Sequence, residues 1–130
     1  MQRSLAWTLV AATVLLTAVG QILIKWQASK ASAAATNGPL SDLLRGLQLL
    51  LNPWVLAGLL AAFLASACWM VAMTRLELSE AYPFTALNFV LILLAGHYLF
   101  SEPVTWGRLL GTLLIIAGVV VIAYSATGRA

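Results

Sequence analysis

Three polar side chains share one face of the first apolar segment and together suggest an anion-binding groove. Thr17, Gln21 and Lys25 are spaced four residues apart, so in a helix they stack along one side. A hydroxyl, an amide and an ammonium in that order would form a polar edge that ends in a positive charge. We interpret this edge as a candidate site for an amphiphile with an anionic head and an apolar tail.

Two of these residues also have a purely structural interpretation, and the sequence leaves both interpretations open. A lysine beside Trp26 is typical of side chains that reach from an apolar segment to the membrane surface. A glutamine one turn inside a span, such as Gln21, typically donates or accepts a hydrogen bond between helices. A central charge in a bilayer costs about 2.5–3.5 kcal/mol on insertion scales, so each polar residue needs an explanation.

A second polar edge is expected on the third apolar segment. Tyr82, Thr85 and Asn88 recur every three residues, and we count them with the first edge as candidate substrate-binding residues. His97 lies further along and is interpreted as a hydrogen-bonded packing histidine. Two further charges, Glu102 and Arg108, are close enough in sequence to pair at a helix start.

The patterns that covalent chemistry requires are not found in the sequence. It contains no Gly-rich phosphate loop, no paired histidines and no Ser-His-acid set. The single cysteine, Cys68, has no partner for a disulfide and no neighbouring base. The sequence therefore predicts a protein that is not an enzyme and that needs no metal and no other cofactor.

Composition places the chain in a membrane. Of its 130 residues 62% are hydrophobic and only 8% are charged, far from the balance of a water-soluble domain. The net charge of +3 comes from basic residues that mostly flank apolar blocks, which indicates membrane anchoring and no nucleic-acid partner.

We expect one transmembrane domain, residues 1–130, folded as an all-α bundle of four membrane-spanning helices. Blocks of about twenty apolar residues match the thickness of a bilayer, and they are predicted at residues 5–24, 54–74, 81–100 and 104–125. A loop from Gln27, closed by the turn at Asn37-Gly38-Pro39, is expected after the first block. Residues 40–51 have the apolar spacing of an amphipathic helix at the membrane surface, ended by Asn52-Pro53. Pro83 is expected in the first turn of the third span.

Small residues predict where the helices approach each other. The second span carries a stripe that includes Gly58, Ala61 and Ala65, and we expect it in the middle of the bundle. Gly107, Gly111 and Gly118 lie roughly on one face of the fourth span, which favours helix pairing there, although glycine is common in membrane helices generally.

Charge does not fix the orientation of the chain. One side of the predicted bundle carries three basic residues and the other carries four, so the positive-inside rule predicts no direction. The first side has Arg3, Arg75 and Arg129, and the second has Lys25, Lys30, Arg45 and Arg108.

Several short motifs resemble the small multidrug resistance proteins of the drug/metabolite transporter superfamily. They are Gly20 with Lys25, Ala81-Tyr82, and the run from Gly111 to Val119. The resemblance implies a four-helix subunit that dimerises through its glycine-bearing fourth helix, often in antiparallel orientation. The drug exporters of that family carry a glutamate in the first helix and an aromatic residue on the third, and here Thr17 and Thr85 occupy the corresponding positions. The chain therefore lacks the residue on which proton-coupled export of cations depends in that family.

A second resemblance is to the two small subunits of the flippase for aminoarabinose-phosphoundecaprenol in Gram-negative bacteria. The motifs similar to one subunit are Val19-Gly20-Gln21 with Lys25, Ala81-Tyr82-Pro83, Leu87-Asn88-Phe89-Val90 and Glu102-Pro103-Val104. The motifs similar to the other are Cys68-Trp69 and Leu76-Glu77-Leu78-Ser79. The resemblance implies that Gln21 and Lys25 bind the phosphate end of the lipid, with Tyr82 and Asn88 lining its path.

These resemblances imply a subunit of a lipid-linked sugar flippase in the bacterial inner membrane. Its expected partners are a polyprenyl-phosphate-linked sugar, membrane lipids, and either a homologous small subunit or a second copy of itself. The alternatives are an exporter of cationic drugs or metabolites, and a structural partner in a larger complex that transports nothing. The sugar, the energy source and the subunit type are left open.

Overall fold

The structure is a computed structural model that describes residues 3–32 and 38–127, and every regular element in those ranges is a helix. The helices are α1 (Arg3–Ser32), α2 (Pro39–Leu49), α3 (Pro53–Ala72), α4 (Leu78–Thr85), α5 (Leu87–Phe100) and α6 (Trp106–Thr127). Four stretches are long and apolar enough to cross a membrane: Arg3–Ser32, Pro53–Ala72, Leu78–Phe100 and Trp106–Ser125. The prediction of an all-α chain with four spans is therefore confirmed for the described residues.

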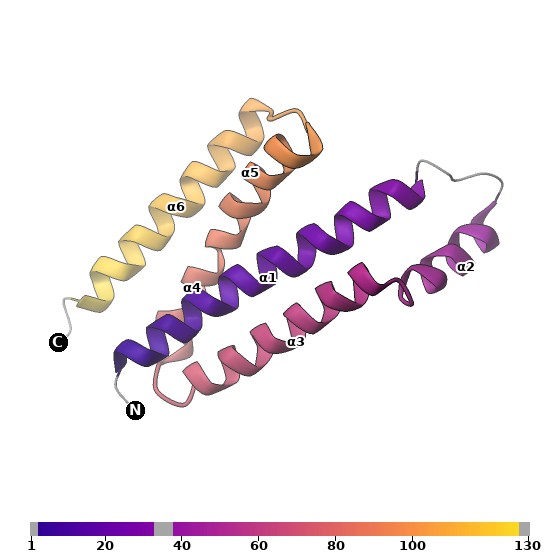
Figure 1. Cartoon of the computed structure of the whole chain (residues 1–130). Coiled ribbons are helices and arrows are strands. Elements are labelled where there is room, and N and C mark those ends of the chain that lie inside the picture. Colours follow the sequence, from indigo (N-terminus) through magenta and orange to yellow (C-terminus); the bar gives the residue numbers. More distant parts are fainter. Residues whose placement is uncertain (1–2, 33–37, 128–130) are drawn as a thin grey trace.

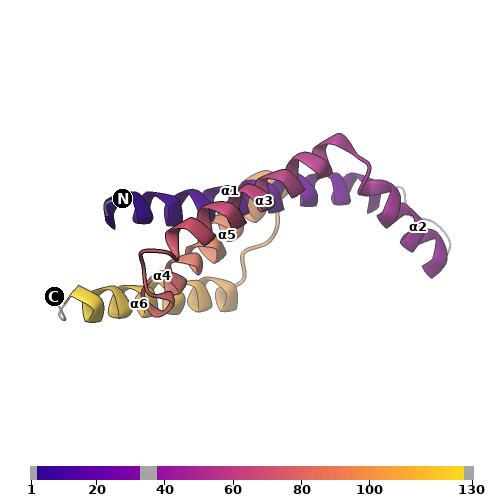
Figure 2. The ribbon, with the colours of Figure 1, turned by 90° about the horizontal axis from the view of Figure 1, so that it is seen from below.

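The helices are arranged around α1 (Figure 1). Helices α1 and α3 lie side by side, and the start of α1 and the end of α6 lie toward the same end of the bundle. Viewed from below, α1 and α3 form one layer, α6 forms another, and α4 and α5 lie between them (Figure 2). We expected α3 in the middle, but α1 is the helix that contacts α2, α3, α4 and α5. The small residues around Gly58 pack against α1.

Two glycines allow α1 and α3 to pack closely. A Cβ atom on Gly20 would lie 2.7 Å from the carbonyl oxygen of Gly58, and one on Gly58 would lie 2.9 Å from the carbonyl oxygen of Gly20. The hydroxyl of Thr13 donates to the carbonyl oxygen of Ala65 across the same interface, at 3.2 Å. The stripe of small residues predicted on the second span is thus a helix-packing surface, and its partner is α1.

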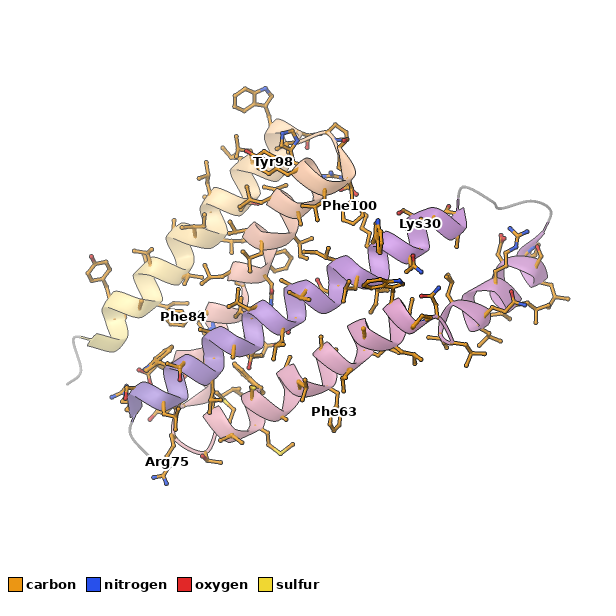
Figure 3. All side chains as sticks on the ribbon, viewed as in Figure 1. Lys30, Phe63, Arg75, Phe84, Tyr98 and Phe100 are labelled. Carbon is orange, nitrogen blue, oxygen red and sulfur yellow. The ribbon has the colours of Figure 1, made fainter. Side chains whose placement is uncertain are left out.

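A cluster of apolar side chains packs the start of α1 against the end of α3 and the start of α4. Its buried members are Ala6, Val10, Ala72, Leu76 and Ala81. Trp7 meets Phe84, labelled in Figure 3, in an edge-to-face contact with ring centres 4.8 Å apart. Phe63, by contrast, points away from the other helices, as expected of a side chain that faces lipid.

Helix α1 is longer than the first predicted span. It continues through Gln27, where a loop was expected, as far as Ser32. At about 1.5 Å per residue its thirty residues reach about 45 Å, well beyond the hydrocarbon core. The Ala- and Ser-rich sequence after Trp26 favours helix as readily as loop, because alanine is the best helix former. Asn37 of the predicted turn lies outside the described residues.

The third span is divided where an unbroken helix was expected. Helix α4 begins at Leu78, directly after Glu77, whose side chain makes no capping hydrogen bond. Pro83 therefore falls inside the helix and not in its first turn. Proline provides no N–H for the carbonyl four residues earlier and crowds it, which bends or breaks a helix. The chain makes a tight turn at Ala86, whose N–H donates to the carbonyl of Pro83 at 3.1 Å, and α5 starts at Leu87.

The break predicted at Asn52-Pro53 is confirmed. Helix α2 ends at Leu49, and Pro53 takes the first position of α3. The side-chain oxygen of Asn52 accepts a hydrogen bond from the backbone N–H of Trp54 at 3.0 Å, which caps the helix. Trp54 then meets Trp26 edge to face, so the start of α3 is fixed to α1.

Helix α6 is the least covered span. Only 6% of its apolar window is buried in the chain, against 28% for α1 and for α3. It contacts α4 and α5, and a Cβ atom added at Gly107, Gly111 or Gly118 would meet no atom of the described chain within 4 Å. The glycine-bearing face of α6 is therefore open.

Candidate functional site

Two ion pairs fasten α1 to the other helices, one near each of its ends. Arg3 pairs with Glu80 at the start of α4, beside the packed apolar cluster. Lys25 pairs with Glu102, which lies between α5 and α6. The two pairs differ in their surroundings, because Lys25 and Glu102 both line a cavity, whereas neither Arg3 nor Glu80 lines any of the three hollows described below. The second end is therefore the candidate site.

The local backbone explains why the carboxylate of Glu102 points toward α1. Helix α5 ends at Phe100, and Ser101 adopts a left-handed conformation with φ of 53°. This turn lets the N–H of Glu102 donate to the carbonyl of Gly96 at 2.9 Å. A Cβ atom on Gly96 would lie only 3.0 Å from the Oε2 atom of Glu102. The missing side chain of Gly96 thus leaves room for the carboxylate.

Glu102 is shared by two cations from different helices. The ammonium of Lys25 donates to its Oε1 atom, and Nη1 of Arg108 lies 4.0 Å from its Oε2 atom. The hydrogen bond from Lys25 lowers the pKa of Glu102, the charges of Lys25 and Arg108 lower it further, and partial desolvation opposes them. One carboxylate with two cations leaves one positive charge uncompensated in this group, which we call the Glu102 cluster.

Other groups hold the Glu102 cluster in place. Lys25 lies 5.2 Å from the centre of the Phe100 ring, in a cation–π contact. Arg108 donates to the carbonyl of Pro103 at 3.3 Å, and Nδ1 of His97 lies 3.3 Å from the carbonyl oxygen of Glu102. The turn between α5 and α6 is therefore tied to its flanking helices as well as to α1.

Two hollows meet at Glu102. The first, which we call the α1–α5 cavity, has a volume of about 160 Å³. It is lined by Gln21, Ile22, Lys25, Ile92, Ala95, Gly96, Phe100 and Glu102. The second, the α5–α6 groove, has about 350 Å³ and is mostly apolar, with His97, Glu102 and Arg108 at its polar end. A molecule with a charged head and an apolar tail fits this pair of hollows better than a uniformly polar one.

The structure brings Gln21 and Lys25 together but puts Thr17 elsewhere. Gln21 and Lys25 both line the α1–α5 cavity. Thr17 lines a separate hollow of about 630 Å³ between α1 and α3, which also contains Thr13 and Ser66. Each step of four residues turns the helix by about 40°, so Thr17 and Lys25 differ in direction by about 80°. The predicted polar edge is thus divided between two sides of α1.

The second predicted edge lies apart from both hollows. Tyr82 is mostly exposed and meets Trp69 edge to face with ring centres 6.0 Å apart. The hydroxyl of Thr85 donates to the carbonyl of Tyr82 at 2.6 Å. The Oδ1 atom of Asn88 is buried and accepts no hydrogen bond within the described chain. None of the three lines the α1–α5 cavity or the α5–α6 groove.

Glu102 is the residue whose role the sequence analysis missed. It was expected to pair with Arg108, and its stronger contact is with Lys25, which lies 77 residues away in the chain. The order of the spans contained a usable signal, because the end of the first span and the end of the third must lie on the same side of the membrane. Among the described residues no three His, Cys, Asp or Glu side chains form a group that could hold a metal ion.

Comparisons with known proteins agree with the resemblance drawn from the motifs. The EamA-like transporter family matches residues 1–124. A probable 4-amino-4-deoxy-L-arabinose-phosphoundecaprenol flippase subunit ArnE of Pseudomonas aeruginosa (strain UCBPP-PA14) is 40% identical over 118 residues, 91% of this chain and 96% of that protein. A probable subunit ArnF of Klebsiella pneumoniae (strain 342) is 37% identical over 105 residues, 75% of this chain and 83% of that protein. No solved structure matches.

These comparisons confirm that the chain is similar to small flippase subunits, and both subunit names occur among its relatives, as the mixture of motifs suggested. Together with four helices able to span a bilayer, they show a multi-pass membrane protein of a transporter family.

Proposed function

This chain belongs to the EamA-like transporter family, and on that premise we propose that it is a small subunit of a flippase for a lipid-linked sugar. The lipid is an undecaprenyl phosphate that carries aminoarabinose or a similar sugar, and the membrane is the bacterial inner membrane. The named activities of the relatives support this proposal. The observation that carries it is the net positive Glu102 cluster at the head of an apolar groove.

The charges of the Glu102 cluster suit the head of such a lipid. A phosphodiester between a sugar and a polyprenol carries one negative charge, for which the cluster offers two cations, Lys25 and Arg108. Charges are costly in the hydrocarbon region unless they are paired, so a matched head group lowers the cost of entry. We assign Lys25 and Gln21 to the phosphate.

The tail and the sugar are assigned to different parts of the chain. The α5–α6 groove is apolar beyond Arg108, and we assign to it the first units of the polyprenyl chain, the rest of which stays in lipid. We keep Thr17, Tyr82, Thr85 and Asn88 as residues that the sugar meets further along its path. The unpaired Oδ1 atom of Asn88 supports this, since a sugar hydroxyl could donate to it.

The open face of α6 is proposed as the dimer interface. Gly107, Gly111 and Gly118 form a surface of small residues on a helix that the rest of the chain hardly covers. Gly111 also lines the α5–α6 groove, so this surface borders the part of the chain assigned to the tail. Such a surface lets a second helix approach closely in a bilayer. Relatives carry two subunit names, which supports a homologous small subunit as the partner, with a second copy of this chain as the other arrangement.

Helix α2 is proposed to lie on the membrane surface. Its leucines, among them Leu40, Leu43 and Leu47, are exposed along one side, and Asp42 and Gln48 occupy the other. An exposed apolar stripe of that kind on a helix too short to span is typical of an interfacial helix.

Substitution of Lys25 tests the site. We expect Lys25→Ala to weaken binding of undecaprenyl-phosphate-aminoarabinose by about 10- to 100-fold, because a hydrogen bond to a charged group contributes about 1.5–3 kcal/mol. The measurement is titration of the purified protein in nanodiscs. Lys30→Ala is the matched control, because it removes the same charge from α1 while Lys30 lies over the Trp26 ring and outside the cavity.

A second variant separates loss of the ligand contact from damage to the ion pair. In Lys25→Ala the carboxylate of Glu102 loses its hydrogen-bond donor, so the double variant Lys25→Ala/Glu102→Gln is measured as well. The proposal predicts weak binding in both. Binding at the wild-type level by either variant would show that Lys25 does not hold the phosphate.

A further inference from the structure

Lys25 and Glu102 form an ion pair with each other, so a ligand that enters the α1–α5 cavity meets both charges. The two side chains are partly exposed, at 49% and 35%, and both line that cavity. A head group that binds Lys25 competes with the carboxylate for the same ammonium. What becomes of Glu102 when Lys25 turns to a ligand therefore decides which ligands bind well.

A purely anionic head group would leave Glu102 poorly paired. Among the described residues its only other cation is Arg108, which is 4.0 Å away and already donates to the carbonyl of Pro103. With Lys25 turned to a phosphate, Glu102 would lose the hydrogen bond that it now accepts from Lys25 and keep only this longer contact. A phosphate alone thus replaces the carboxylate at Lys25 and gives the carboxylate no new donor.

A head group with both charges avoids this cost. Its phosphate takes the place of the carboxylate at Lys25, and its ammonium takes the place of Lys25 at the carboxylate. Lys25 and Glu102 then each keep a hydrogen-bonded partner of opposite charge, because one hydrogen bond to a charged group is exchanged for another of the same kind. The Oε2 atom, for which Gly96 leaves space, lies on the same cavity and accepts no bond shorter than the 4.0 Å contact with Arg108 in the described chain.

We propose that Glu102 is a specificity-determining residue that receives the amino group of the transported sugar, so that the site selects lipids whose head group is zwitterionic. This inference rests on the proposed function and goes beyond it in naming the residue that recognises the amino group. The phosphate binds at Lys25 on one wall of the α1–α5 cavity, and the amine binds at Glu102 on the other. Both walls are supplied by one subunit.

The test compares two lipids that differ only in the charge of the sugar nitrogen. One is undecaprenyl-phosphate-aminoarabinose, and the other is the same lipid with its amine acetylated. Binding of each to the wild-type protein and to Glu102→Gln is measured in nanodiscs. We expect the wild type to prefer the free amine by about tenfold or more, and Glu102→Gln to bind both lipids equally.

Two control variants separate recognition from folding. Glu80→Gln removes the carboxylate of the other ion pair of α1, far from the cavity, and should keep the wild-type preference. Glu102→Asp keeps the charge and should keep part of the preference. If Glu102 had a purely structural role, Glu102→Gln would weaken the binding of both lipids by the same factor.

The outcomes distinguish this inference from the proposed function. A wild type that binds both lipids equally, or a Glu102→Gln variant that still prefers the amine, overturns the inference and leaves the flippase proposal standing. A wild type that binds neither lipid overturns both. Loss of the preference in Glu102→Gln alone, with Glu80→Gln unchanged, supports the inference.

Discussion

The close approach of α1 and α3 at Gly20 is the packing feature most sensitive to a single added methyl group. In Gly20→Ala the new Cβ atom would lie 2.7 Å from the carbonyl oxygen of Gly58, about 0.7 Å closer than the 3.4 Å at which ordinary contact begins. The neighbouring atom belongs to a backbone, so no change of rotamer relieves the clash. The two helices must move apart.

The cost follows from opposing terms. Overpacking of a well-packed contact destabilises by about 1–3 kcal/mol. Alanine in place of glycine favours the helix by up to about 1 kcal/mol. The difference is a net loss of about 0–2 kcal/mol, centred near about 1 kcal/mol, in the free energy of unfolding. Gln21 follows directly in the chain, so the shift also disturbs the α1–α5 cavity and should weaken lipid binding.

The assay is reversible unfolding in mixed detergent micelles, followed by far-ultraviolet circular dichroism. The matched control is Gly46→Ala in α2, where an added Cβ atom meets nothing within 4 Å, and this variant should be as stable as the wild type or slightly more so. Equal or greater stability of Gly20→Ala relative to the wild type would refute the argument that the glycine contact holds α1 against α3.

Three further predictions concern other parts of the chain. The pKa of Glu102 is lowered in the folded state by its hydrogen bond to Lys25 and by nearby cations. The stabilising contribution of Glu102 is therefore present above its ordinary pKa of 4.5 and is lost as the pH falls through the lowered folded pKa. The stability advantage of the wild type over Glu102→Gln should vanish in that acid range, and an advantage independent of pH would contradict this. Thr13→Val keeps the shape of the side chain and removes the hydroxyl, which lies 2.9 Å from the carbonyl oxygen of Leu9 in its own helix and 3.2 Å from that of Ala65 in α3. The variant should lose about 0.5–1 kcal/mol in the unfolding assay, and no loss would mean that these hydrogen bonds contribute nothing. Gly118→Leu fills the exposed face of α6 at a position outside the α5–α6 groove, so it should abolish dimers in size-exclusion chromatography with light scattering and leave the helix content unchanged. An unaltered dimer would remove α6 as the interface.

The spans and their close packing could be predicted because they depend on local sequence. Twenty-residue apolar blocks have few structural alternatives in a membrane. The Asn52-Pro53 break and the small residues around Gly58 likewise indicate a cap and a close contact without knowledge of the rest of the fold. What the stripe at Gly58 could not indicate was its partner, since any neighbouring helix would satisfy the same pattern.

The features that the sequence analysis missed depend on details beyond local pattern. The end of α1 was expected near Lys25 and Trp26 because charge and tryptophan mark an interface, yet a helix can continue past its apolar span when its residues are good helix formers, as the stretch to Ser32 shows. The third span is divided because α4 begins at Leu78, before the predicted start at residue 81, so that Pro83 lies inside the helix. Such boundaries are the least predictable property of an element. The Lys25–Glu102 pair joins the first span to the turn after the third, and only the packing of α5 against α1 brings the two residues together.

The most direct test of the central claim is native mass spectrometry of the gently purified protein, read for both its stoichiometry and its bound lipid. We predict a dimer that carries a polyprenyl-phosphate lipid, with the bound fraction reduced in Lys25→Ala and preserved in Lys30→Ala. A dimer that carries no such lipid and takes up a quaternary ammonium compound in its place would contradict the flippase account and favour an exporter of cations.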